Sequence, residues 1–286
     1  EPWKYPKETE WPKGLTIHHR DELDMLQRQL AEVQGVSILI YDQTCAAEKR
    51  RRRKRGTFPD PDKRVVINDL VCEGCGDCGV KSNCVSVQPL ATEWGRKRTI
   101  DQSSCNKDYS CVKGFCPSFV TIEGGQLRKP EPASSPALEI LISELPAPPS
   151  RRINGAHDLL VAGVGGTGVV TIGAIITMAA HLEGKGASVL DFMGFAQKGG
   201  AVLSYVRLAD SPDNLRQVRI DAGEAEALIA CDLVVATDPR ALRVMREGTR
   251  VVANMDILPT ADFIGDRNID FEGAKRIKTL RKICGA

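Results

Sequence analysis

The stretch from Cys72 to Cys84, CEGCGDCGVKSNC, constrains this chain more than any other part of its sequence. Three of its four cysteines follow a C-x2-C-x2-C spacing, and a distant cysteine precedes a proline at Cys116-Pro117. Structural zinc sites are usually built from separated cysteine pairs, and disulfide frameworks are typical of short secreted chains. The tight loop with a distant Cys-Pro is typical of iron–sulfur clusters. We therefore predict an iron–sulfur module, with zinc or a disulfide as the alternatives.

The cysteine region also repeats internally. Residues 66–72, VINDLVC, align with residues 99–105, TIDQSSC. The matched pairs are Ile67 with Ile100, Asn68 with Asp101, Cys72 with Cys105, Cys78 with Cys111 and, after one gap, Cys84 with Cys116. Cys75 falls opposite Asp108, so the second loop reads C-x2-D-x2-C.

This pattern resembles the two-cluster bacterial ferredoxins, in which the fourth cysteine of each half binds the cluster of the other half. The resemblance implies two ligand sets: Cys72, Cys75, Cys78 and Cys116 for a first 4Fe-4S cluster, and Cys84, Cys105 and Cys111 for a second. Asp108 is either the fourth ligand of the second cluster or a solvated loop residue, in which case one corner of that cluster has no protein ligand. The spacers before Cys84 and Cys116 are longer than the usual three residues.

A second body of α/β type is predicted after the cysteine region, because apolar strands alternate with helical patterns. The predicted strands are 158–164, 187–192, 201–209, 232–238 and 250–256, and the predicted helices are 168–182, 223–230, 239–247 and 272–283. This alternation favours a largely parallel, doubly wound sheet. The fold class is thus α/β with an inserted α+β iron–sulfur module, in which a ferredoxin-like domain precedes a Rossmann-like one.

A glycine-rich turn joins the first strand of this body to its first helix. Gly163, Gly165 and Gly168 match G-x-G-x-x-G, and Asp191 ends the next strand, as in dinucleotide-binding folds. A nicotinamide- or flavin-dependent iron–sulfur reductase would bind its dinucleotide at these residues. A second glycine-rich loop, residues 194–200, is not a requirement of such folds.

Residues 159–182 carry no charge, which leaves a membrane helix as an alternative. The glycine cluster within them indicates a turn between a buried strand and a buried helix instead. The first residues, EPWKYPKETEWPKG, lack the apolar stretch of a signal peptide. We therefore expect no membrane association and a cytoplasmic location.

Positive charge is concentrated in one run. Residues 49–55 are all Lys or Arg, whereas the rest of the chain is acidic and the formal net charge is only +2. A zinc-containing nucleic-acid module that uses this run is the second alternative. Nucleic-acid binding modules present broad basic faces with aromatic residues, so we expect a charged surface segment and no nucleic-acid partner.

Four segments are predicted along the chain. An amphipathic helix at 20–34 and a buried strand at 36–42 indicate that residues 1–56 are the last part of an α/β domain. The cysteine module spans 57–128, a proline-rich linker spans 129–152, and the Rossmann-like body spans 153–286. We expect the chain to be an internal piece of a longer polypeptide.

Taken together, these motifs resemble the 2-oxoacid:ferredoxin oxidoreductases, and in particular the long fused indolepyruvate (arylpyruvate) ferredoxin oxidoreductases. GVSILIYDQTCAAEKRRRRKRG is similar to the end of that family's thiamine diphosphate domain. The cysteine stretches VCEGCGDCGVKSNC and IDQSSCNKDYSCVKGFCPSF are similar to its iron–sulfur module, and GVGGTGVVTIGAII with FAQKGGAV to its gamma-type domain.

The resemblance implies an oxidative decarboxylation in which an arylpyruvate and coenzyme A (CoA) give an aryl-acetyl-CoA and electrons pass through the clusters to ferredoxin. It implies thiamine diphosphate and Mg as cofactors of the full-length enzyme, with a homo-oligomeric assembly. No residue of this segment is assigned a catalytic acid–base role. Gln197, Lys198, Gly199 and Gly200 are the candidates for a loop that faces the substrate or the coenzyme.

Overall fold

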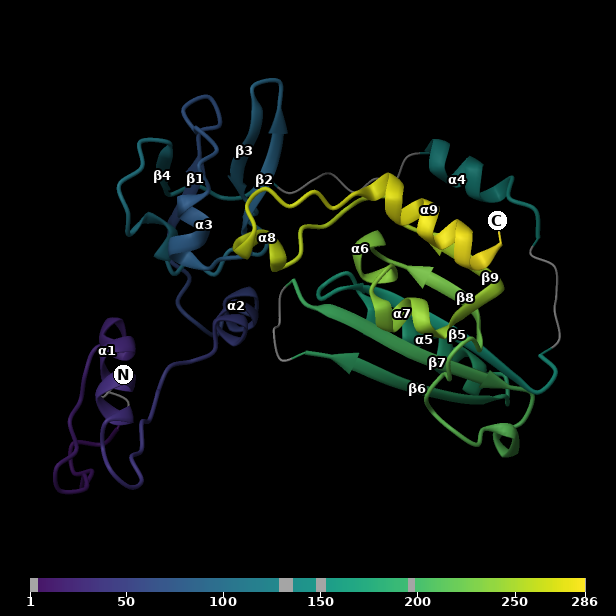
Figure 1. The fold of residues 1–286 in the computed structure, drawn as a ribbon, viewed down its shortest axis with the longest axis horizontal. Coiled ribbons are helices and arrows are strands. Elements are labelled where there is room, and N and C mark those ends of the chain that lie inside the picture. Colours follow the sequence, from purple (N-terminus) through teal and green to yellow (C-terminus); the bar gives the residue numbers. More distant parts are fainter. Residues whose placement is uncertain (1–4, 129–135, 148–152, 195–198, 286) are drawn as a thin grey trace. The chain divides into compact units, whose positions relative to one another are not determined.

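The computed structural model describes residues 5–128, 136–147, 153–194 and 199–285 (Figure 1). The chain divides into two compact units, residues 1–60 and residues 61–286.

The first unit is helical. Its helices are α1 (Leu23–Ala31), preceded by a short 3-10 turn (Arg20–Glu22), and α2 (Ala46–Lys54). The helix predicted at 20–34 is therefore present, and the basic run lies largely on α2, where Glu48 pairs with Arg51 and Arg52. The strand predicted at 36–42 is wrong for this structure, because these residues pair with no strand among the described ones and Val36 is 92% exposed.

The cysteine region contains two antiparallel strand pairs. Strand β1 (Lys63–Ile67) pairs with β4 (Phe119–Glu123), and β2 (Val87–Thr92) pairs with β3 (Gly95–Ile100). The helix α3 (Asp77–Ser82) contains Cys78, and a 3-10 turn (Ser110–Val112) contains Cys111, so each begins one residue before the last cysteine of its loop. Val65, Val87 and Ile100 form the buried core, against which four of the cysteines pack.

A five-stranded sheet forms the second body of this unit. Its strands are β5 (Ala156–Val164), β6 (Gly186–Met193), β7 (Ala201–Ala209), β8 (Ala225–Ala230) and β9 (Met245–Ala253), in the order β6-β7-β5-β8-β9. The pairs of β5 with β8 and of β8 with β9 are parallel, but β7 runs antiparallel to both β5 and β6.

The mixed sheet corrects the expectation of a largely parallel one. Parallel neighbours need a crossover of a dozen or more residues, whereas β6 and β7 are separated only by residues 194–200. This short spacing was visible in the sequence and indicates an antiparallel pair.

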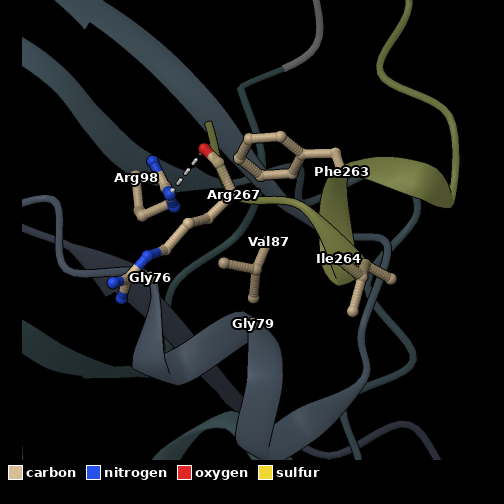
Figure 2. A pocket seen from close by; sticks show the side chains of 7 residues that line it. All are labelled: Gly76, Gly79, Val87, Arg98, Phe263, Ile264 and Arg267. Carbon is tan, nitrogen blue, oxygen red and sulfur yellow. Dashed lines mark hydrogen bonds between the residues drawn. The ribbon is translucent and has the colours of Figure 1, made fainter. Parts of the chain in front are cut away.

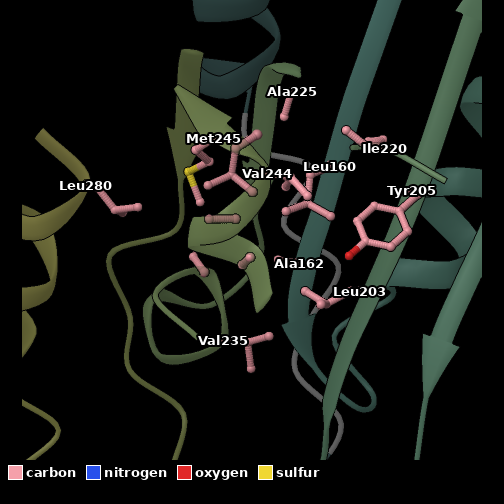
Figure 3. Packing of buried hydrophobic residues seen from close by; sticks show 14 of the residues in the cluster. Leu160, Ala162, Leu203, Tyr205, Ile220, Ala225, Val235, Val244, Met245 and Leu280 are labelled. Carbon is pink, nitrogen blue, oxygen red and sulfur yellow. The ribbon is translucent and has the colours of Figure 1, made fainter. Parts of the chain in front are cut away.

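Helices cover both faces of the sheet. Beyond the cysteine region, the helices are α4 (Pro136–Ser143), α5 (Val169–Leu182), α6 (Leu233–Ala236), α7 (Pro239–Val244), α8 (Asp262–Gly265) and α9 (Gly273–Cys284), and a 3-10 turn spans Pro212–Asn214. On one face, Leu160 and Leu203 pack with residues of α6, α7 and α9 (Figure 3). On the other face, Val161 and Val206 pack against α5. Strand β5 is therefore buried from both sides, as its continuous apolar sequence predicts.

The sequence assigned two neighbouring elements the wrong way round. Residues 223–230, predicted as a helix, contain strand β8, and residues 232–238, predicted as a strand, contain α6. Parallel pairing with both β5 and β9 outweighs the helical pattern of the first segment. The fully buried Asp232 begins α6, because its Oδ1 accepts hydrogen bonds from the backbone N–H groups of Val234 and Val235.

A buried ion pair fixes the register of β5 against β7. Asp158 and Arg207 are direct cross-strand partners, and the guanidinium donates two hydrogen bonds of 2.5 Å to the two carboxylate oxygens. The Asp158 carboxylate raises the pKa of Arg207. Such bidentate pairs add geometric specificity, so this one aligns the strand that leads into the glycine turn.

Residues 159–182, considered above as a membrane helix, are divided between β5, the glycine turn and α5. No helix in the described ranges has both the length and the apolar character needed to cross a membrane.

Candidate metal centre

The two cysteine loops share an unusual backbone conformation. Gly74 and Gly76 have φ of 73° and 82° in the first loop, and Lys107 and Tyr109 have φ of 51° and 59° in the second. These are equivalent positions in the internal repeat, two and four residues after Cys72 and Cys105. Left-handed backbone is unfavourable for Lys and Tyr and costs about 1 kcal/mol or more at each position. The repeat seen in the sequence is thus confirmed in the backbone.

Each loop also directs a backbone N–H at its first cysteine. The N–H of Gly74 donates to Cys72 Sγ at 3.4 Å, and the N–H of Lys107 donates to Cys105 Sγ at 3.4 Å. In iron–sulfur sites, hydrogen bonds to the ligand sulfurs help to set the reduction potential. Each loop therefore presents one backbone N–H donor to its first cysteine.

The first loop brings together three thiols. Cys72 is 8% exposed, Cys78 is half-buried and Cys75 is exposed. Burial raises the pKa of Cys78, and the nearby Cys72 and Cys75 act in the same direction. Bringing these groups together as thiolates requires a compensating positive charge, such as that of bound iron.

A second group of thiols combines cysteines from both halves of the repeat. Burial, together with the nearby Cys84 and Cys105, raises the pKa of Cys111 to about 12. Cys84 precedes the second loop in the chain and packs on the same buried core as the cysteines of that loop. The structure therefore brings together Cys84, Cys105 and Cys111, the three thiols that the ferredoxin resemblance groups.

Cys116 was predicted to complete the first group. It is exposed, and its Sγ lies 3.0 Å from the Oγ of Ser118. Its place as the fourth ligand stays a prediction.

Asp108 occupies the same place in its loop as Cys75 does in the first. Both residues are exposed, and each lies between the two left-handed residues of its loop. The Oδ1 atom of Asp108 accepts hydrogen bonds from the N–H and the hydroxyl of Ser110, at 3.2 and 3.1 Å. The carboxylate also lies close enough to Cys111 to raise the pKa of that thiol.

The donor set fits iron–sulfur clusters better than a single ion. Among the described residues, no three His, Cys, Asp or Glu side chains converge on a position that could hold one metal ion. Zinc requires such convergence, whereas each thiolate of a four-iron cluster binds a different iron atom. The two groups of three thiols, with one backbone N–H donor at the first cysteine of each loop, are donors of the kind that such clusters use.

Positively charged side chains surround the first loop, and sequence reasoning missed them. Lys97 Nζ donates to the carbonyl of Cys72 at 2.6 Å, and Arg267 Nη1 donates to the carbonyl of Cys75. Arg98 and Arg267 line a small pocket over the loop, with Phe263 beside them (Figure 2). The basic strand GRKRTI was the sequence signal for Lys97 and Arg98, but Arg267 had none, because it lies far along the chain.

The two glycine-rich loops lie next to each other. The N–H of Gly165 donates to the carbonyl of Gly200 at 2.8 Å, and the carbonyl of Gly199 accepts from Ala261 at 3.3 Å. A Cβ at residue 199 would lie 3.5 Å from Val85 of the cysteine module. Gln197 and Lys198, the other candidates for this loop, lie outside the described residues.

Asp191, the dinucleotide candidate, lies on β6 opposite Ser204 of β7. Its Oδ1 atom and the Oγ of Ser204 are buried without a hydrogen-bond partner among the described residues. No contact in the described part of the chain assigns a ligand to them.

Changing Gly74 to Ala should weaken the first loop. A Cβ at residue 74 would overlap the backbone oxygen of Arg96, and the positive φ adds strain. We therefore expect the free energy of unfolding to fall by about 2 kcal/mol and the protein to bind less iron. Calorimetry should show a melting midpoint lower by about 4 °C or more.

The matched control is Gly79→Ala on α3, where a Cβ meets no atom within 4 Å and Ala favours the helix. Equal melting midpoints and equal iron contents for the two variants would show that the left-handed turn is not required.

Comparisons with known proteins place this chain near one group of enzymes. Residues 158–281 match the pyruvate ferredoxin/flavodoxin oxidoreductase family. The indolepyruvate oxidoreductase subunit IorB of Methanothermobacter thermautotrophicus is 30% identical over 103 residues, which cover 36% of this chain and 50% of the relative. The pyruvate/ketoisovalerate oxidoreductases common subunit gamma of Thermococcus litoralis is 33% identical over 100 residues, covering 33% of this chain and 49% of the relative. The chain thus spans about half the length of the curated relatives it matches.

A solved structure, pyruvate oxidoreductase subunit PORC from Thermotoga maritima, is similar over 46% of this chain and 58% of its own length. Its sequence identity is 16% and the TM-score is 0.31.

Proposed function

We propose that this chain, whose residues 158–281 form a domain of the pyruvate ferredoxin/flavodoxin oxidoreductase family, is the electron-transfer segment of an indolepyruvate-type 2-oxoacid:ferredoxin oxidoreductase. The observation that carries the proposal is the presence of two equivalent cysteine loops in the same chain as this family domain. The names of the curated relatives, which are subunits of indolepyruvate and pyruvate/ketoisovalerate oxidoreductases, support the same assignment.

The proposed reaction is the oxidative decarboxylation of an arylpyruvate. The arylpyruvate, CoA and two oxidised ferredoxins give an aryl-acetyl-CoA, carbon dioxide, a proton and two reduced ferredoxins, since each ferredoxin accepts one of the two electrons. Thiamine diphosphate with Mg would supply the electron sink for decarboxylation. No residue of this chain is assigned a role in that step.

Within this enzyme, residues 57–128 would be the iron–sulfur domain. Cys72, Cys75, Cys78 and Cys116 would hold one 4Fe-4S cluster, and Cys84, Cys105, Cys111 and Asp108 the other. The supporting features are the paired N–H donors at Cys72 and Cys105 and the proximity of Cys84 to the second loop. The clusters would supply one-electron steps, and the folded loops shield the buried thiols from water.

Residues 153–286 would be the gamma-type domain, joined to the cysteine module by the linker 129–152, and residues 1–56 would belong to the thiamine diphosphate domain. The loop 194–200, with Gly199 and Gly200, would face the substrate or the coenzyme. The hydrogen bond from Ala261 to the carbonyl of Gly199 and the position of Gly199 near Val85 support this role, because they place Gly199 next to the cysteine module. Further subunits, a second copy of the chain and ferredoxin are the proposed partners.

Iron and acid-labile sulfide analysis of the chain purified without oxygen tests the proposal. We expect about eight irons and eight sulfides per chain if both clusters are 4Fe-4S. Stoichiometric zinc without sulfide would contradict it, and would favour the zinc-containing alternative. Saturable NAD(H) binding that Asp191→Ala weakens would instead favour a dinucleotide-dependent reductase.

Asp108 should make its cluster the more labile of the two, because a carboxylate oxygen suits sulfide-bound iron less well than a thiolate does. Mild oxidation should convert this cluster to a three-iron form first, and electron paramagnetic resonance should detect it. Asp108→Cys should restore resistance to oxidation, and Asp108→Ala should leave the three-iron form as the stable species.

The matched control is Asp101→Ala, because Asp101 is an aspartate of the same segment that does not lie opposite a cysteine in the repeat. Its carboxylate accepts hydrogen bonds from the N–H and the hydroxyl of Ser103. Identical spectra for the wild type, Asp108→Ala and Asp108→Cys would exclude Asp108 as a ligand.

A further inference from the structure

Arg98 is a buried cation beside the first cysteine loop. It lies on β3 and is only 3% exposed. Its Nη2 atom would lie 3.1 Å from a Cβ at residue 76, which places the guanidinium against the turn between Cys75 and Cys78.

The direct contacts of Arg98 are neutral ones (Figure 2). Nη1 donates to the carbonyl of Lys97 at 3.0 Å and Nη2 to the carbonyl of Arg267 at 3.4 Å. The guanidinium carbon lies 4.8 Å from the centroid of the Phe263 ring. Among the described residues, no carboxylate forms an ion pair with Arg98.

Burial of an unpaired charge is strongly unfavourable, so a cation in such a place indicates a nearby negative group. Burial lowers the pKa of Arg98, and the sulfur atoms of Cys78 and Cys72 are the groups that oppose this effect most. An anion that compensates Arg98 would therefore lie in the first loop, because the guanidinium packs against the turn of that loop at Gly76.

The second loop has no equivalent cation. In the internal repeat, Ile100 matches Ile67, so Arg98 matches Val65, a buried apolar residue. The second loop instead places the carboxylate of Asp108 near Cys111. The two halves, similar in backbone, thus differ in charge.

We propose that Arg98 is the buried counter-charge of the first cluster and holds its reduction potential above that of the second cluster. This inference rests on the proposed function, because it requires both loops to hold clusters. The uptake of one electron adds one negative charge to a cluster, and a cation fixed at short range in a poorly solvated site stabilises the reduced form. Because of Arg98, the first cluster would be reduced before the second.

A redox titration of the full chain with dithionite, followed by electron paramagnetic resonance, tests this assignment. Arg98→Met keeps the apolar stem and removes the charge. We expect the oxidation equilibrium of the first cluster to shift about tenfold toward the oxidised form, which lowers its midpoint by about 59 mV. Arg98→Lys should retain most of the wild-type midpoint because it retains the charge.

Arg64→Met is the matched control. It removes the same charge from β1, where Arg64 Nε donates to the carbonyl of Gly125, and it should change neither midpoint. The first cluster is recognised as the one that resists mild oxidation. If Arg98→Met does not retain iron, the titration uses Arg98→Gln, because its amide can still donate to the two carbonyls.

Unchanged midpoints in both neutral variants, or the same shift in Arg64→Met, would overturn the inference while leaving the proposed function intact. Loss of iron in the neutral variants but not in Arg98→Lys would support it, because the charge would then be needed to hold the cluster. Loss in all three would assign Arg98 to packing alone. A wild-type chain without iron and sulfide would overturn the proposed function itself.

Discussion

Left-handed turns at two equivalent positions in each cysteine loop are the constraint on which the rest of the cysteine module depends. They direct the N–H groups of Gly74 and Lys107 at the sulfurs of Cys72 and Cys105. They also place Cys75 and Asp108 at equivalent outward positions. Glycine allows this conformation in the first loop, whereas the second loop adopts it with Lys107 and Tyr109 at a cost in strain. Strain of this kind is typical of functional sites.

One segment, residues 258–267, connects the sheet body with the cysteine module. The carboxylate of Asp232 caps α6 and also accepts from the N–H of Leu258 at 3.0 Å, which fixes the segment that leads into α8. That segment contacts Gly199 through Ala261, and beyond it Arg267 reaches the carbonyl of Cys75. In this way a fully buried aspartate of the sheet body helps to position the side chains that cover the first loop.

The sequence predicted the features that depend on local pattern. The cysteine repeat and the strand, turn and helix around Gly165 follow from spacing and periodicity, whereas the grouping of Cys84 with the second loop follows from the resemblance to two-cluster ferredoxins. Prediction from the sequence failed where contacts with distant segments determine the secondary structure. Residues 225–230 form strand β8 because β5 and β9 pair with them on either side, and the strand predicted at 36–42 has no partner among the described residues. Arg98 could not be assigned either, since its significance depends on Phe263 and Arg267, which are distant in the chain.

In the proposed iron–sulfur module the two halves exchange ligands, so that Cys84 would bind the second cluster. The most direct measurement is the iron content and the electron paramagnetic resonance spectrum of Cys84→Ala in the full chain, purified without oxygen. We expect this variant to lose the oxidation-sensitive cluster and to keep the resistant one. Loss of the resistant cluster, with the oxidation-sensitive one retained, would show that Cys84 belongs to its own half and would contradict the exchange.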